Sequence, residues 1–190
     1  MKNNKIAFIV PGFTELTKQE KYRKIAEYFK EAGIEPVMVN IVWKRKIMSD
    51  YINEIIEKAN LKPFIILGFS FGAFSSLIAS LKIKPKYLIL CSLSPYFKED
   101  LPYLGKWDKT TLGKARFRDF NKYTFSDIAK KVKSKTYIIY GEKEYKKVIE
   151  KSKKAKRYIK NSELFIAPNA KHDINNLNYQ RTIKEIILNL

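Results

Sequence analysis

Short apolar runs alternate with amphipathic segments along almost the whole of this 190-residue chain. The runs at residues 5–10, 63–67 and 87–91 are nearly continuous, which is typical of strands buried on both faces. Between them, apolar residues recur every three or four positions, as in helices with one buried face. Strands that alternate with helices form right-handed crossovers and a mostly parallel sheet. We therefore predict a doubly wound, three-layer α/β fold with a six-stranded, mostly parallel sheet.

Capping residues and turn formers suggest the boundaries of these elements. Thr17 is predicted to begin the first helix, because Thr17 and Glu20 have the spacing of a capping box, and Ser49 is predicted to cap the second. The strands are expected at residues 5–10, 36–42, 63–67, 87–91, 136–140 and 163–166. The later helices are expected at residues 72–81, 144–159 and 176–189. The functional loops should gather at the carboxyl ends of the strands.

One connection is far longer than the others. About 40 residues separate the fourth predicted strand from the fifth, whereas such joins usually need only a few. Between Tyr96 and Phe125 this stretch carries eight aromatic residues, which favour packing over disorder. We predict one domain over residues 1–190, with a small cap-like excursion at about 94–125. The excursion either roofs a pocket or covers the sheet edge, and one small cap can do both.

The chain is strongly basic, with 38 Lys and Arg residues against 19 Asp and Glu residues and a net charge of +19. Residues 146–160 alone hold seven lysines and one arginine. Such a field attracts polyanions, but arginine, which phosphate recognition favours, supplies only six of the 38 cations. Apolar residues such as Val148 and Ala155 recur beneath the lysines. We interpret the segment as a solvated outer helix and do not expect a nucleic-acid partner.

The sequence indicates a soluble, cytoplasmic protein with no membrane span, metal or cofactor. The first apolar run ends at Pro11-Gly12, well short of a signal-peptide core or a membrane helix. One histidine and one cysteine cannot build the usual zinc sites, and there is no glycine-rich phosphate loop. Cys91 ends an apolar run and is expected to be buried and without chemistry. The oligomeric state is left open.

The segment Gly68-Phe69-Ser70-Phe71-Gly72 lies where the third predicted strand gives way to a helix. A serine at such a sharp turn has its hydroxyl lifted clear of the sheet, and Gly68 and Gly72 let the strand and helix approach closely. The pattern predicts Ser70 as a nucleophile, which needs a base to take its proton. His172, the only histidine, follows the sixth predicted strand and should reach the same edge of the sheet.

An acidic residue is also needed, to orient the imidazole and stabilise its charged form. The fifth predicted strand ends in Gly141-Glu142-Lys143-Glu144. With these segments the chain resembles the α/β-hydrolase family, in which serine, acid and histidine occur in that chain order. The resemblance implies Glu144 as the acid, three residues after the glycine that ends the strand. Glu142 and Asp173 remain alternatives.

The resemblance also implies an oxyanion hole made by the backbone N–H groups of Phe13, in Pro11-Gly12-Phe13-Thr14, and of Phe71. The chain starts directly at its first strand, without the opening hairpin of larger relatives, and resembles a minimal member. We expect a serine hydrolase, esterase-like or thioesterase-like, that cleaves a small-molecule acyl substrate by a Ser-His-Glu triad. Peptidase and acyltransferase activities stay open. The alternative is a non-catalytic protein of this fold that binds polyanions or an acidic partner through its basic C-terminal half.

Overall fold

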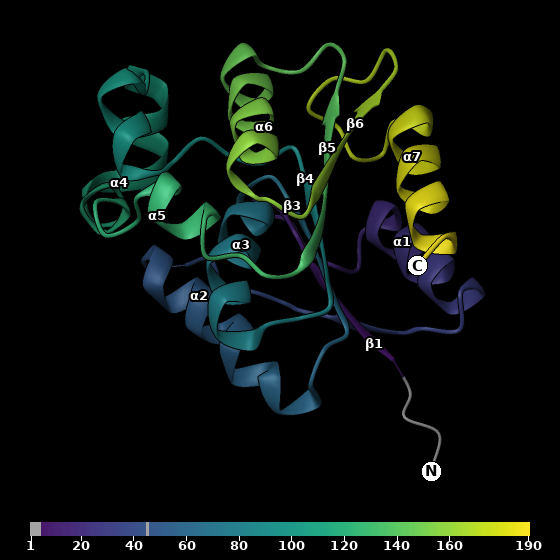
Figure 1. Cartoon of the computed structure of the whole chain (residues 1–190). Coiled ribbons are helices and arrows are strands. Elements are labelled where there is room, and N and C mark those ends of the chain that lie inside the picture. The colour runs from purple at the N-terminus through teal and green to yellow at the C-terminus, as the bar shows by residue number, and fades with distance from the viewer. Residues whose placement is uncertain (1–4, 45) are drawn as a thin grey trace.

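The computed structural model describes residues 5–44 and 46–190 (Figure 1). Within these residues, six strands form one sheet in the order β2-β1-β3-β4-β5-β6, and every neighbouring pair is parallel. The strands are β1 (Ile6–Val10), β2 (Glu35–Met38), β3 (Ile65–Phe69), β4 (Tyr87–Cys91), β5 (Lys135–Gly141) and β6 (Ser162–Ala167). Because all strands run the same way, their carboxyl ends lie at one edge. The predicted sheet is confirmed.

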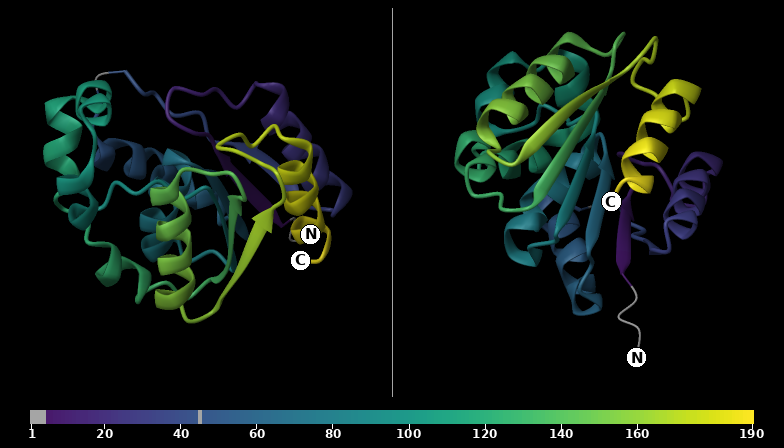
Figure 2. Two further views of the ribbon diagram at one scale, coloured as in Figure 1. Left: turned by 90° about the horizontal axis from the view of Figure 1, so that it is seen from above. Right: turned by 45° about the vertical axis from the view of Figure 1, so that its right-hand side comes forward.

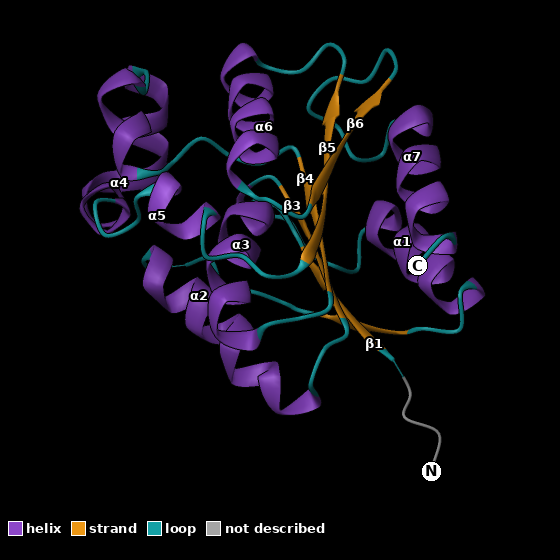
Figure 3. Ribbon diagram, viewed as in Figure 1, coloured by secondary structure: helices purple, strands orange, loops and turns teal. Residues whose placement is uncertain are grey.

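Helices cover both faces of the sheet and give three layers (Figures 2 and 3). One face carries α1 (Glu20–Glu31) and α7 (Leu177–Leu188). The other carries α2 (Met48–Glu57), the short 3₁₀ helix η1 (Lys58–Leu61), α3 (Phe71–Ile83) and α6 (Lys146–Tyr158). Alternate strand residues face opposite cores, so Phe8 packs beneath α3 whereas Ile9 packs beneath α1 and α7.

Both predicted helix caps are wrong. The N-cap of α1 is Gln19, and the Thr17 hydroxyl instead hydrogen-bonds to the side chain of Asn40. In α2, Ser49 lies inside the first turn, where its backbone N–H donates to Asp119 at 2.7 Å and its hydroxyl at 3.0 Å. Distant polar partners therefore outcompete the local backbone for these two hydroxyl groups.

The second strand is shorter than predicted, because the chain leaves the sheet after Met38. The following loop brings Trp43 against the loop after β1, and the indole N–H of Trp43 donates to the backbone carbonyl of Glu15 at 3.2 Å. The Trp43 ring also lies 5.4 Å from Phe13 and 5.9 Å from Phe71, between ring centroids. The loops after β1 and β2 thus support each other at the carboxyl edge.

The long connection between β4 and β5 is folded. It contains the 3₁₀ helix η2 (Lys98–Tyr103) and the helices α4 (Lys106–Phe120) and α5 (Phe125–Ala129), and α4 is kinked at Gly113. Phe97 and Phe120 are fully buried and lie 4.6 and 5.6 Å from Phe74 of α3, between ring centroids. These rings pack the connection against α3.

The basic helix α6 is an outer helix with one buried cation. Lys151 is 3% exposed and forms an ion pair of 2.7 Å with Asp100, while burial lowers the pKa of its ammonium group. This ion pair connects α6 to η2.

Cys91 is completely buried, as expected, and burial raises the pKa of its thiol far above the ordinary range. No helix in the described ranges is long and apolar enough to cross a membrane.

Candidate active site

A strained turn at Ser70 joins β3 to α3. Ser70 has φ 54° and ψ −113°, a combination that residues other than glycine rarely adopt. Glycine is needed on both sides of it. A Cβ atom on Gly68 would lie 2.4 Å from the carbonyl oxygen of Gly72, and one on Gly72 would lie 2.3 Å from that of Pro11. The close packing of β1, β3 and α3 therefore holds the Ser70 hydroxyl at the carboxyl edge of the sheet.

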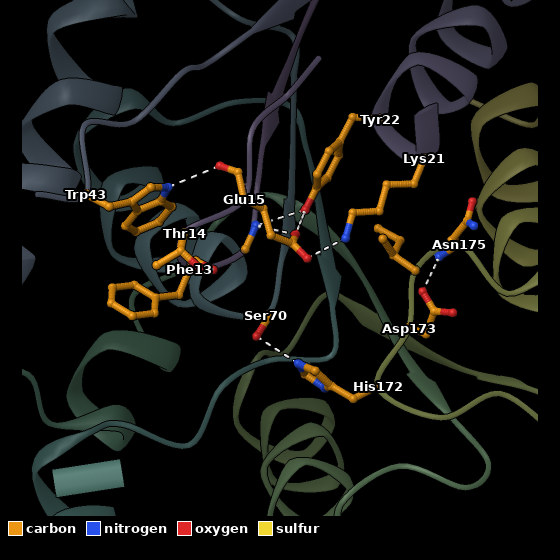
Figure 4. Close-up of polar contacts among 12 residues, drawn as sticks. Phe13, Thr14, Glu15, Lys21, Tyr22, Trp43, Ser70, His172, Asp173 and Asn175 are labelled. Atoms are coloured by element: carbon orange, nitrogen blue, oxygen red, sulfur yellow. Dashed lines mark hydrogen bonds and ion pairs between the residues drawn. The ribbon is translucent and has the colours of Figure 1, made fainter. Parts of the chain in front are cut away.

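The loop after β6 brings His172 to this hydroxyl (Figure 4). Its Nε2 lies 2.9 Å from the Oγ of Ser70, and its Nδ1 lies 2.8 Å from an oxygen of Glu144, in the turn after β5. A carboxylate can only accept hydrogen bonds, so Nδ1 carries the ring proton and Nε2 is free to accept from Ser70. The structure thus brings together the three side chains that the sequence singled out.

Glu144 is buried, with 7% of its surface exposed, and its carboxylate is fully engaged. Besides His172, it accepts hydrogen bonds from the Ser92 hydroxyl at 2.7 Å and from the backbone N–H of Tyr145 at 3.0 Å. Ser92 also lies 2.8 Å from the hydroxyl of Tyr179, whose pKa is raised well above its ordinary value by burial. This network from β4 and α7 fixes the carboxylate against the imidazole.

The two alternative acids lie elsewhere. Glu142 accepts a hydrogen bond from the backbone N–H of Asn169 at 2.8 Å. Asp173 accepts one from the backbone N–H of Asn175, also at 2.8 Å (Figure 4). Both side chains stabilise turns near the imidazole, and Glu144 is the carboxylate that contacts it.

The imidazole also packs near two aromatic rings, and the Ser70 hydroxyl lies near a second hydroxyl group. The centroid of the His172 ring lies 5.1 Å from that of Phe69 and 5.6 Å from that of Tyr145. The Ser94 hydroxyl lies 3.2 Å from that of Ser70. The sequence offered no signal for Ser92 or Ser94, because both belong to an ordinary Cys-Ser-Leu-Ser loop without a motif.

The backbone N–H groups of Phe13 and Phe71 donate no hydrogen bond to any residue in the described ranges. Phe71 opens α3, and the first N–H groups of a helix have no acceptor within it. Phe13 lies in a turn closed by a hydrogen bond of 3.1 Å from Glu15 N–H to the Gly12 carbonyl. The rings of Phe13 and Phe71 are 5.2 Å apart, so the two segments adjoin. Two free donors beside a serine can bind a negative oxygen atom.

Glu15, which was not among the predicted site residues, organises the turn after β1. Its carboxylate accepts hydrogen bonds from the backbone N–H of Gly12 at 3.2 Å and from the hydroxyl of Tyr22, and it pairs with the ammonium group of Lys21 (Figure 4). Burial and then the Glu15 charge raise the pKa of Tyr22 far above its ordinary value, so Tyr22 remains a donor. An acid three residues after a turn glycine was the available signal.

A cavity of about 840 Å³ opens at Ser70. The connection between β4 and β5 supplies one wall of it, so the aromatic excursion both packs on α3 and borders the site. Much of the lining is apolar, and it includes Phe13, Phe71, Tyr96, Leu104, Leu112 and Val148. Charged residues of the lining come from the loop after β1, through Glu15, from α4, through Asp108, and from α6, through Lys146 and Lys147. In the described ranges no three His, Cys, Asp or Glu side chains cluster as metal ligands.

Comparison with known proteins gave structural matches only: no protein-family model and no curated protein matched the sequence. Est1E from Butyrivibrio proteoclasticus superposes with a TM-score of 0.82 and 18% identity, over 98% of this chain and 86% of that one. A putative hydrolase from Agrobacterium vitis S4 gives 0.80 and 12%, over 98% and 88%. MGS-MChE2, an alpha/beta hydrolase enzyme from a lagoon-sediment metagenome, gives 0.74 and 16%, over 97% and 89%. This chain has the α/β-hydrolase fold.

The α/β-hydrolase fold explains why the site lies where it does. In it, the loops after successive parallel strands meet at one edge, which here joins the Ser70 turn, the Glu144 turn and the His172 loop. At identities this low the matches establish the fold and leave the chemistry to the site itself. Chemically, the hydrogen-bonded chain from Glu144 through His172 to Ser70 can move a proton from a hydroxyl group to an imidazole.

Proposed function

We propose that this chain is a serine hydrolase that cleaves an ester or a thioester through an acyl-enzyme intermediate on Ser70. The observation that carries the proposal is the imidazole of His172, which is hydrogen-bonded at Nε2 to Ser70 and at Nδ1 to Glu144. A serine hydroxyl is a poor nucleophile until a base takes its proton. The hydrolases among the solved structures of the same fold support hydrolysis as the reaction class.

In the first step, Nε2 of His172 accepts the Ser70 proton while the Ser70 oxygen forms a bond to the substrate carbonyl carbon. The carbonyl electron pair moves onto its oxygen, which the N–H groups of Phe13 and Phe71 stabilise. Each such donor contributes about 10²- to 10³-fold to turnover. Glu144 stabilises the imidazolium that forms, so the negative and positive charges of the intermediate both have partners.

In the second step, His172 gives the proton to the leaving oxygen or sulfur as its bond to carbon breaks, which leaves the acyl group on Ser70. A water molecule then gives a proton to Nε2 and attacks the acyl carbon. Collapse of this second intermediate returns the proton to Ser70 and releases the acid. General-base assistance of this kind contributes about 10²- to 10⁴-fold to the rate.

The lining and the volume of the cavity favour a substrate with an apolar acyl group of small or medium size. Its aromatic lining includes Phe13, Phe71 and Tyr96, and its 840 Å³ lies in the range of small-molecule sites, roughly 300 to 1,000 Å³. A solved structure of Est1E, which has the same fold, contains bound ferulic acid. We therefore include aromatic acyl groups in the proposed substrate class.

Labelling with a fluorophosphonate tests the proposal, because the reagent phosphonylates an activated serine. Intact-mass analysis should show one adduct on the wild-type chain, and none on Ser70→Ala. Ser94→Ala is the matched control, since Ser94 lies 3.2 Å from Ser70 and should leave the adduct in place. The absence of an adduct, or an adduct that persists in Ser70→Ala, would overturn the proposal. No adduct together with salt-dependent binding to a polyanion would instead support the non-catalytic alternative.

A further inference from the structure

We propose that the leaving-group side of the cavity is an anion subsite, and that Lys146, supported by Lys147, selects substrates whose leaving group carries a negative charge. The inference rests on the proposed hydrolase function and specifies its substrate class. It is drawn from the position of these lysines in the cavity and from the hydrogen-bond partners of every charged group that lines it.

The chemistry of the site assigns a side of the cavity to the leaving group. Because Nε2 of His172 protonates the leaving atom, the leaving group must lie next to the imidazole. The ring of Tyr145 lies 5.6 Å from that imidazole, and Lys146 and Lys147 follow directly in the chain and line the same cavity. The acyl group is left with the apolar wall formed by Phe13, Phe71 and Tyr96, whose rings adjoin one another.

The acidic groups of the cavity do not neutralise this side. Glu15 is paired with Lys21 and the hydroxyl of Tyr22. Asp108 accepts hydrogen bonds from the Tyr96 hydroxyl and from the backbone N–H of Gly105, each at 3.1 Å, and thereby caps α4. Both carboxylates therefore have partners, in α1 for Glu15 and in the β4–β5 connection for Asp108.

The two lysines differ in what holds them. Lys147 donates to the backbone carbonyl of Tyr103, so its charge is fixed between α6 and the end of η2. Lys146 is 90% exposed, and its ion-pair partner, Glu150, lies 4.0 Å away at the limit of contact. The Lys146 ammonium group is therefore the charge at this rim that is available to a ligand.

Local stability does not explain cations at this place. Lys146 and Lys147 are the first two residues of α6, whose first turn has no acidic side chain. The N-terminal end of a helix carries partial positive charge, so lysines there oppose helix formation. The preceding acid, Glu144, is committed to His172 and Ser92. Functional sites often contain residues that are unfavourable for local stability, as two lysines are at a helix N-terminus. A bound anion would relieve the repulsion between these lysines and the partial positive charge of the helix end.

A matched pair of esters tests the proposal. The leaving group of 4-butyryloxybenzoate carries a carboxylate, whereas that of its methyl ester is neutral. Lys146→Gln should lower kcat/KM for the carboxylate substrate about two- to fivefold, the range of an exposed ion pair, and leave the methyl ester unchanged. Lys153→Gln, which removes an exposed charge of the same helix outside the cavity, should change neither. In the wild type, high salt should abolish the contribution of Lys146 to kcat/KM for the carboxylate ester over the methyl ester.

A third substrate separates the two sides of the cavity. An aryl monoester of glutaric acid carries its carboxylate in the acyl group, and its hydrolysis should not respond to Lys146→Gln. Equal losses for the charged and neutral esters, or the same selective loss in Lys153→Gln, would overturn the anion subsite. If both esters are hydrolysed in a Ser70-dependent way and the carboxylate ester does not respond to Lys146→Gln, only the subsite fails. If no ester is hydrolysed and Ser70 is not labelled, the hydrolase function itself fails.

Discussion

The Nε2 of His172 lies 2.9 Å from the Oγ of Ser70, although 102 positions separate the two residues in the chain. Ser70 follows β3 and His172 follows β6, with β4 and β5 between these strands in the sheet. The loops after β4 and β5 close the gap, through Ser92 and Glu144. Parallel strands place all of these loops at one edge, whereas antiparallel neighbours would send alternate loops to opposite edges.

Replacement of Glu144 by glutamine should abolish most turnover while the chain stays folded. An amide can donate to Nδ1 and so favour the wrong imidazole tautomer, a change that lowers kcat about 10⁴-fold in serine proteases. Steady-state hydrolysis of an aryl ester measures the loss, with circular dichroism as the check on folding. Glu142→Gln and Asp173→Asn should retain turnover near that of the wild type. A larger loss in either of them than in Glu144→Gln would contradict the geometry.

Turnover should fall as the pH is lowered. A protonated imidazole cannot accept the Ser70 proton, so acid removes the base, and activity should reach a plateau on the alkaline side of the transition. The range to be measured runs from acid to mildly alkaline pH, within the limits at which circular dichroism shows that the chain stays folded. The check is the pH profile of kcat/KM, which reports ionisations of the free enzyme. A flat profile across this range would argue against His172 as the base.

Glu15→Gln should lower kcat about ten- to hundredfold with little change in KM, because small displacements of reacting groups are costly at this level. Glu15 holds Gly12 and Tyr22, and thus the turn that presents the Phe13 N–H. The matched control is Glu20→Gln, a largely exposed acid of α1. A purely structural role would lower the melting temperature without this separation of kcat from KM.

Gly72→Ala should destabilise the fold by about 1 to 3 kcal/mol or more, as expected for overpacking at a rigid contact. The added Cβ would lie 2.3 Å from the carbonyl oxygen of Pro11 and 2.4 Å from that of Val10, and neither backbone segment can move without disturbing β1. Gly105→Ala is the control, since its Cβ would meet only Asp108 at 3.6 Å. Urea unfolding of both variants measures the difference, and equal stabilities would show that the turn can relax.

The free energy of unfolding should decline above about pH 10. Burial raises the pKa values of Tyr22, Tyr96 and Tyr179 above the ordinary value of 10.0, so alkali ionises these tyrosines in the unfolded chain first. The folded state then binds more protons, and stability is lost as the pH rises, by about 1.4 kcal/mol per pH unit for each group. Urea unfolding at pH 9 to 11 measures the slope. Tyr96→Phe should give a shallower slope than the wild type, and an identical slope would refute the prediction.

Several parts of this protein were readable from its sequence because each has a local signature. Buried parallel strands are apolar runs, which is why β1, β3, β4, β5 and β6 were predicted to within about two residues at each end, the usual limit of such boundaries. The turn at Ser70 needs glycines at fixed spacing, and the lone histidine left a single candidate base. For Glu144 the resemblance to a known family was also required, since Glu142 lies in the same turn and Asp173 adjoins the histidine.

Other parts were decided only by the tertiary structure. The hydroxyls of Thr17 and Ser49 had the right chemistry and spacing for helix caps, but Asn40 and Asp119, distant in sequence, provide their partners. Ser92 likewise lies in an unremarkable loop until the fold places it against Glu144. Local patterns determine which backbone conformation a segment favours, whereas the partner of a polar side chain depends on where the packed layers leave it. The sequence by itself therefore determined the α/β scaffold and the chain order of the candidate catalytic residues, and tertiary packing decided which side chains hold those residues in place.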